Sequence, residues 1–225
     1  MYKLYTLIIG LFISSSSLIA QCIATPVSLI SNYSFEANTG CPSGTSQMNL
    51  VNTWLQPFGG TSDYFNTCGF TNISIFNPPP MPIPGGGSGY VGFYDNSTYD
   101  EYIGSCLTTP MVAGNSYTFQ FEIAPSAAGV STTTIGLFGT TNCANMSTNT
   151  SGTNYNCPSA VSGSFVNIVN TPLITMTSAA WTTVTVTFIA PSNIAGVAIG
   201  AACGSTGSNS TYFYMDELVL NTTAS

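Results

Sequence analysis

Hydrophobic and polar residues alternate along short segments of the chain. Segment 181–189 places valine or phenylalanine at every second position with threonine between them, and segment 117–123 alternates in the same way through Tyr117, Phe119, Phe121 and Ile123. A repeat of two residues predicts β-strands with one apolar face. Further strands are predicted at 29–36, 51–56, 90–94, 102–108, 133–138, 165–169, 194–200 and 212–220. Short strands separated by glycine- and proline-containing turns predict an all-β fold, a two-sheet antiparallel β-sandwich.

Two segments interrupt this rhythm. Residues 77–89 are rich in proline and glycine, and proline lacks the backbone donor that a sheet requires, so we expect a connecting loop there, with a proline-rich ligand as the alternative. Residues 142–164 are rich in Asn, Thr and Ser and predict a polar surface loop. No change in composition marks a second domain. Residues 21–225 are therefore expected to form a single β-sandwich domain.

The first 20 residues have the order of a secretory signal peptide. Lys3 precedes the apolar run Leu7–Ile13, and cleavage is expected after Ala20. Lipidation of Cys22 is the alternative, but Gln21 stands where a small residue would be needed. No other stretch reaches about 18 apolar residues, so we expect a mature chain with no transmembrane segment, secreted or held at the cell surface.

Charge excludes several classes of function. The 225 residues include eight acidic residues, one lysine, no arginine and no histidine, and the lysine lies in the predicted leader. Without a basic surface no nucleic-acid binding is expected, and without histidine the nucleophiles that depend on imidazole are excluded. A glycosidase needs only two carboxylates. However, Asp100 and Glu101, like Asp216 and Glu217, are adjacent and would point to opposite faces of a strand. We therefore expect a protein that is not an enzyme.

Seven cysteines follow the predicted leader, which indicates an exported, oxidising setting. Separation along the chain favours pairs that close the polar loops: Cys41–Cys68 and Cys143–Cys157, which leaves Cys106–Cys203. Each bridge would stabilise the fold by roughly 2–4 kcal/mol. Because the number is odd, Cys22 is expected to be free, lipidated or paired with another chain.

An ordered set of motifs carries a family resemblance. The segments are 29–36 (LISNYSFE), Trp54, 112–121 (VAGNSYTFQF), 181–188 (WTTVTVTF) and 212–218 (YFYMDEL). Together they resemble the carbohydrate-binding jelly rolls of the galactose-binding-like superfamily. Segments 41–44, 63–68, 89–94 and 99–103 look like the variant found in secreted surface proteins of gliding bacteria. The resemblance spans nearly the whole mature chain and implies a jelly-roll sandwich.

The resemblance also implies a metal site. In similar modules the first and last strands lie side by side, and an acidic residue from each helps to hold a structural calcium ion. The matching positions are Glu36 and Asp216, with Asn38 as a further oxygen donor. Calcium takes six to eight oxygen ligands and needs no nitrogen. The alternative is that Glu36 only ends a strand and Asp216 only caps a turn.

Sugar binding requires aromatic faces that stack on pyranose rings and polar groups that bind hydroxyls. Two segments, 63–70 and 90–102, supply both. The predicted ligand-binding residues are Tyr64, Asn66, Tyr94, Asp95, Asn96, Tyr99 and Asp100. The alternative is that such aromatics belong to the core, and we expect Trp54 and Trp181 to be core residues.

These features favour a secreted, non-catalytic module that binds glycan or a surface polymer at the cell exterior. A second hypothesis is a self-assembling structural or adhesive subunit of an extracellular filament or coat. In that case residues 21–30 would donate a strand to a neighbouring subunit, or Cys22 would form a disulfide between chains.

Overall fold

The computed structural model describes residues 28–71, 73, 87–96, 99–126, 129–146, 157–158, 164–177, 180–205 and 211–223. The predicted leader, residues 21–27 with Cys22, residues 77–86 and most of the loop 142–164 lie outside the described residues. The backbone of Tyr99 is described, but its side chain is not.

Strands dominate the described residues. They are β1 (Trp54–Leu55), β2 (Asp63–Asn66), β3 (Gly89–Asn96), β4 (Tyr99–Asp100), β5 (Tyr102–Met111), β6 (Ser116–Pro125), β7 (Ser131–Thr133), β8 (Ile135–Thr140), β9 (Phe165–Asn170), β10 (Ile174–Met176), β11 (Thr182–Ile189), β12 (Ile194–Ala201) and β13 (Thr211–Thr222). Two short 3-10 helices, η1 (Met48–Leu50) and η3 (Cys143–Asn145), accompany them. Within the described ranges no helix is long and apolar enough to cross a membrane.

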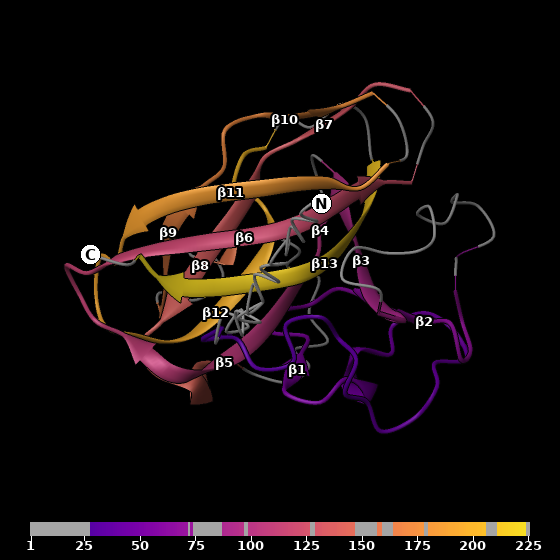
Figure 1. The fold of residues 1–225 in the computed structure, drawn as a ribbon, viewed down its shortest axis with the longest axis horizontal. Helices are drawn as coiled ribbons and strands as arrows, with labels where there is room; N and C mark the ends of the chain where they lie inside the picture. Colours follow the sequence, from indigo (N-terminus) through magenta and orange to yellow (C-terminus); the bar gives the residue numbers. More distant parts are fainter. Residues whose placement is uncertain are drawn as a thin grey trace, which may run out of the picture.

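The strands form the predicted two-sheet antiparallel sandwich (Figure 1). One sheet has five strands in the order β1-β5-β12-β8-β9. The other has six, in the order β11-β6-β13-β3-β2, with β4 paired to β3. Strands β7 and β10 pair separately. Since every paired strand is antiparallel and the sheets lie in two layers, the all-β sandwich prediction is confirmed.

The core lies between the two sheets, where the period-two alternation predicted it. Tyr117, Phe119, Phe121 and Ile123 of β6 are all buried in the main hydrophobic cluster. In β11 the same face carries buried Phe188 with half-buried Val184 and Val186, while the threonines between them are exposed. This cluster joins residues of both sheets, so the alternation identifies which face of each strand points inward.

The predicted strand 29–36 is wrong, because this segment forms turns. Asn32 and Phe35 adopt positive φ angles of 52° and 59°, the left-handed region, which asparagine tolerates better than most residues. The Asn32 side chain accepts a hydrogen bond from the Ala37 amide and donates to the Ala37 and Asn52 carbonyls, at 2.8–2.9 Å. These bonds hold the turn and prevent an extended strand.

The first described residues still lie beside the last strand. The Leu29 amide donates to the Leu220 carbonyl of β13 at 2.7 Å, and the Leu29 carbonyl accepts from the Thr108 amide of β5 at 2.8 Å. Residues 28–30 therefore connect the two sheets of their own chain. Donation of this part of segment 21–30 to a neighbouring subunit would break both bonds.

The disulfide pairing was predicted correctly for one bridge of three. Cys41 pairs with Cys68, but Cys143 pairs with Cys106 of β5 and Cys157 pairs with Cys203 after β12. The predicted pairs Cys143–Cys157 and Cys106–Cys203 are therefore wrong. The polar loop is not closed on itself, because Cys143 is bound to β5 and Cys157 is bound to the segment that follows β12. Sequence separation alone could not show which strands lie next to the loop.

Candidate functional site

The candidate site is the outer face of the six-stranded sheet, which points away from the five-stranded sheet (Figure 1). Side chains at alternate positions of β3 and β13 reach this face, because Val91, Phe93, Phe213 and Met215 occupy the core. The outward positions form an aromatic cluster of their own, the aromatic floor, which consists of Phe65, Tyr90, Tyr212 and Tyr214.

Ring contacts hold the aromatic floor together. Phe65 stacks on Tyr90 with a centroid distance of 5.1 Å, and Tyr212 meets Tyr214 edge to face at 5.2 Å. Pairs with these geometries add about 0.5–1.5 kcal/mol each beyond the area that they bury. All four floor residues are at most 2% exposed. The floor is therefore a second, smaller core on the outside of the sheet.

Three partly exposed aromatic residues surround the aromatic floor. These rim residues are Phe70, Tyr94 and Trp181. Trp181 meets Tyr90 edge to face at 6.4 Å, and Tyr94 meets Tyr212 at 6.3 Å. Trp181 is thus not the main-core residue that the sequence led us to expect. The rim presents ring surface to the exterior.

Tyr212 lies directly over Gly92 of the neighbouring strand. A Cβ atom at Gly92 would be 2.2 Å from the Tyr212 hydroxyl oxygen and 2.5–2.6 Å from two ring carbons. The hydroxyl is held in place, since it donates to Asp63 Oδ2 at 2.6 Å. Only glycine leaves room for this ring without displacing it.

We expect the substitution Gly92→Ala to destabilise the protein by about 1–3 kcal/mol, because the methyl group must push Tyr212 away from Asp63. Urea denaturation of the purified chain measures this loss. Gly44→Ala is the matched control, since a Cβ there has no atom within 4 Å, and we expect it to stay within about 0.5 kcal/mol of wild type. Equal stability of the two variants would contradict the packing described here.

Asp63 is a buried carboxylate beneath the floor. Besides the Tyr212 hydroxyl it accepts the Ser46 amide at 2.6 Å. Burial raises its pKa to about 6, the two hydrogen bonds oppose that shift, and the nearby charge of Glu101 adds to it. Asp63 therefore orients Tyr212 rather than facing a ligand.

Polar side chains continue the outer face beyond the rim. Glu122 of β6 accepts a hydrogen bond from the Thr183 hydroxyl of β11 at 2.6 Å, and Gln120 accepts one from Thr185 at 3.5 Å. Thr183, Thr185 and Gln120 are exposed and Glu122 is half-buried. Thr182 pairs with Ile123, so Trp181 lies at the end of the same row of side chains as Thr183 and Thr185. Ring surface and hydrogen-bonding groups therefore meet along one edge of the face.

Two buried polar atoms of β13 have no hydrogen-bond partner among the described residues: Tyr214 Oη and Asp216 Oδ2. Buried polar groups are nearly always paired, so each such atom indicates a missing partner. Both side chains lie on the outer face, two residues apart on one strand. Asp216 is fully buried, and its other oxygen accepts the Glu217 amide at 2.7 Å.

Three of the other seven acidic residues, Glu36, Glu122 and Glu217, lie near Asp216. Burial, together with the charges of Glu217, Glu36 and Glu122 and against the opposing Glu217 amide, raises the pKa of Asp216 to about 9. Burial and the charges of Glu122 and Glu36 also raise the pKa of Glu217. The described residues include no lysine, arginine or histidine, so no basic side chain among them neutralises this group.

The acidic group fits the predicted calcium site. Asp216 Oδ2 is an oxygen without a partner, and Glu36 uses one oxygen, Oε1, to accept the Ser88 and Gly89 amides at 2.7 Å each. Within the described part of the chain no three acidic or cysteine side chains lie close enough to hold a metal by themselves. Carbonyl or water oxygens would have to complete six to eight ligands. The predicted donor Asn38 instead gives its amide hydrogens to the Glu36 carbonyl and the Tyr64 hydroxyl.

The predicted ligand-binding residues do not form one surface. Tyr64, Asn66 and Asp95 are 0%, 4% and 3% exposed, so they do not present side chains to a ligand. Tyr64 points into the main core, where its hydroxyl donates to the Phe35 carbonyl and accepts from Asn66 and Asn38. Asp95 accepts from Thr133 at 2.6 Å. These three positions are structural.

The remaining predicted positions lie at one end of β3. Tyr94, Asn96 and Asp100 are half-buried, and Asp100 accepts the Asn96 amide at 3.2 Å. Tyr99 pairs with Asn96 through the backbone. Burial and the charge of Asp95 raise the pKa of Asp100 to about 7, although the Asn96 amide opposes the shift. Of these residues, Tyr94 belongs to the aromatic rim and so to the candidate site.

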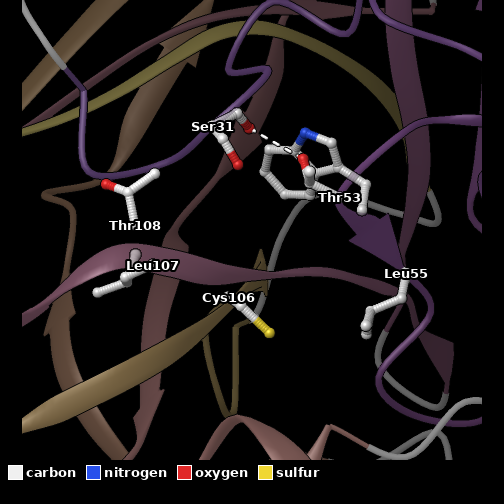
Figure 2. Close-up of a pocket in the computed structure, with 7 residues that line it drawn as sticks. Ser31, Thr53, Leu55, Cys106, Leu107 and Thr108 are labelled. Carbon is white, nitrogen blue, oxygen red and sulfur yellow. Dashed lines mark hydrogen bonds between the residues drawn. The ribbon is translucent and has the colours of Figure 1, made fainter.

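A separate shallow cavity of about 460 Å³ lies at the edge of the five-stranded sheet (Figure 2). It is lined by Ser31, Thr53, Trp54, Leu55, Cys106, Leu107 and Thr108. Three of its polar side chains are already used: Thr53 donates to the Ser31 carbonyl at 3.2 Å, the Trp54 indole to the Asn32 carbonyl at 2.8 Å and Thr108 to the Leu29 carbonyl at 3.1 Å. Since specific ligand sites need polar groups aimed at the ligand, the outer face is the better candidate.

Comparisons with known proteins give structural likenesses at low identity. No protein-family model matches the chain, and no curated protein matches it by sequence. One similar structure is a Clostridium thermocellum xylanase 10B fragment with CBM22-1 and GH10 modules. The likeness covers 85% of this chain and 28% of that fragment, with 11% identity and a TM-score of 0.47. The N-terminal cellulose-binding domain of Cellulomonas fimi β-1,4-glucanase C is also similar. The likeness covers 90% of this chain and 99% of that domain, with 10% identity and a TM-score of 0.42. The K1 cleaved adhesin domain of Lys-gingipain from Porphyromonas gingivalis W83 is a third similar structure. The likeness covers 85% of this chain and 96% of that domain, with 14% identity and a TM-score of 0.40.

Proposed function

We propose that this protein is a secreted, non-catalytic module that binds glycan or a surface polymer through the outer face of its six-stranded sheet. The observation that carries the proposal is the meeting of exposed ring surface with hydrogen-bonding side chains along that face. Trp181 and Tyr94 supply the rings, and Glu122, Gln120 and Thr183 supply the polar groups. Three disulfides support an oxidising, extracellular setting.

The chemistry of the face suits a sugar. The apolar side of a pyranose ring packs against an aromatic ring, and its hydroxyls exchange hydrogen bonds with carboxylates, amides and hydroxyls. The aromatic floor fixes the rim rings from below, so little side-chain entropy remains to be lost on binding. The Tyr214 hydroxyl, which has no partner among the described residues, is an additional polar group beneath them.

Binding should depend on Trp181. We expect Trp181→Ala to raise the dissociation constant for a retained glycan by roughly thirtyfold, since one well-packed aromatic contact is worth about 2 kcal/mol. Affinity electrophoresis in gels cast with soluble polysaccharides, followed by titration of any polymer that retards wild type, measures this change. Trp181→Phe keeps a ring and is expected to retain part of the affinity.

A matched variant separates binding from folding. Val166→Ala changes an exposed apolar residue on β9 of the other sheet, and we expect retardation equal to that of wild type. Circular dichroism must show folded protein for every variant. Unchanged retardation of a folded Trp181→Ala, Tyr94→Ala double variant would refute the outer face as the binding surface, and retardation by no polymer at all would refute the function.

We also propose that Glu36 and Asp216 hold a structural calcium ion. The buried Asp216 oxygen without a partner supports this assignment, as do the two neighbouring carboxylates Glu122 and Glu217 and the absence of basic side chains from the mature chain. When bound, the ion would supply positive charge to the group and join the turn at 36 to the last strand. It would stabilise the face rather than take part in a reaction.

A further inference from the structure

Strand β11 is the outermost strand of the six-stranded sheet. It pairs with β6 through eight consecutive residue pairs without a register shift, from Thr182–Ile123 to Ile189–Ser116. Among the described strands β11 has no second partner. Figure 1 shows it running beside β6 on the side away from β13. Its other edge therefore offers a regular row of backbone donors and acceptors.

Open edges are usually protected in proteins that must stay monomeric. The common devices are lysine or another charge on the edge, proline, a β-bulge or a very short strand. Strand β11 has the sequence TTVTVTFI, with eight residues, no charge, no proline and no bulge. One of the two edge strands of the other sheet, β9, has no second partner among the described strands; its sequence is FVNIVN, and it is also uncharged. Neither edge carries a group that would repel a second strand.

We propose that two copies of this chain associate edge to edge, with β11 of one copy pairing antiparallel with β11 of the second copy. Centring the pairs on Thr185 places Thr183 opposite Thr187 and Val184 opposite Val186. A shift of one residue would instead set threonines opposite valines and direct one copy's core face outward. The strand is thus complementary to itself in a register that keeps both cores inside.

Exposed apolar side chains favour a second copy as the occupant. Ile189 is 66% exposed at the end of β11, and in this register it lies opposite Trp181 of the second copy, so part of the apolar surface of Ile189 becomes buried. Val166, 41% exposed, is on the adjacent edge strand β9. Since all the acidic residues lie off these two strands, the pairing brings no like charges opposite one another.

The pairing would join the two six-stranded sheets into one continuous sheet. A two-fold axis perpendicular to the sheet leaves both outer faces on the same side. The dimer itself does not depend on what the outer face binds, so its test uses mass rather than glycan retention.

Sedimentation velocity of the full mature chain over a concentration series tests the proposal. We expect a reversible monomer–dimer equilibrium, and we expect Thr185→Lys to weaken it by at least tenfold in dissociation constant, because two lysines would face each other at the two-fold axis. Thr109→Lys adds the same charge at an exposed position of β5 and is expected to leave the equilibrium unchanged. A wild type that remains monomeric at every concentration would overturn the proposal, and so would an unchanged dimer of Thr185→Lys.

A cross-link tests the register and does not depend on the lysine variant folding. In a Cys22→Ser background, Thr185→Cys places two cysteines directly opposite, where Cβ atoms of a strand pair are about 4.5–5.5 Å apart. Mild oxidation is expected to give a covalent dimer on non-reducing gels, whereas Thr109→Cys is expected to give none. Equal cross-linking of both variants would reject pairing through β11.

Discussion

Calcium is expected to raise the thermal midpoint of chelator-treated protein, and Asp216→Asn is expected to abolish that rise. At a calcium concentration about 100 times the dissociation constant, binding to the folded state alone stabilises it by about 2.7 kcal/mol. Asparagine keeps the shape of the side chain but removes one carboxylate from the group formed with Glu36, Glu122 and Glu217. Differential scanning fluorimetry with EDTA, calcium or magnesium measures the shifts.

The same variant distinguishes a metal ligand from an ordinary buried residue. Without metal, wild type buries Asp216 beside three other acidic side chains with one of its oxygens unpartnered among the described residues, so Asp216→Asn is expected to be at least as stable as wild type in EDTA and less stable in calcium. Asp95→Asn is the control, because Asp95 is equally buried but lies outside this group. A calcium response that survives in Asp216→Asn would eliminate the proposed site, as would the absence of a response in wild type.

Asp63 is expected to make the protein more stable in mild acid than at neutral pH. Its folded-state pKa of about 6 lies above its ordinary value of 3.8, so folding favours the protonated form. The stability that Asp63 contributes is therefore present below about pH 4 and is lost as the pH rises to about 6. The expected loss is about 3 kcal/mol. Urea denaturation at a series of pH values should show Asp63→Asn without this part of the decline.

Tyr212→Phe provides an independent check on Asp63. The Tyr212 hydroxyl stabilises the charged carboxylate, so its removal should raise the pKa of Asp63 further and extend the loss of stability to higher pH. Asp100 and Asp216, whose pKa values are raised to about 7 and about 9, contribute to the pH dependence of every variant, so the comparison is always with wild type. Identical pH profiles for wild type and Asp63→Asn would contradict this account of the buried carboxylate.

Period-two alternation predicted most of the sandwich, and it also contained a signal that we did not use. In segments 90–94 and 212–214, Phe93 and Phe213 lie inward, which leaves Tyr90, Tyr94, Tyr212 and Tyr214 on the opposite face. If the tyrosines had been grouped by the face of the strand on which they lie, instead of by the sequence segment that contains them, the aromatic floor would have been located. The outward orientation of Trp181 was missed because its apolar neighbours suggested the core. Its odd residue number places it on the same face of the strand as the outward-pointing Thr183 and Thr185.

Other features depend on contacts between distant segments and could not be read from local patterns. The turn at Asn32 is held in part by a hydrogen bond to the distant Asn52 carbonyl, and this contact overrides a sequence that favours a strand. Tyr64 was expected at a surface, but its position in β2 points into the core between the sheets. The cysteine pairs follow from which strands lie beside the 142–164 loop, and only the folded topology determines that.

The position of β13 has a consequence for how the chain folds. It is the last strand in the sequence but lies inside its sheet, between β6 and β3, and near its end the Leu220 amide donates to Ser28 Oγ, 192 positions earlier. The sheet cannot be completed until the final residues are available, and contacts between such distant residues slow folding. A chain that is still emerging from the ribosome therefore cannot close its sandwich until β13 has been synthesised.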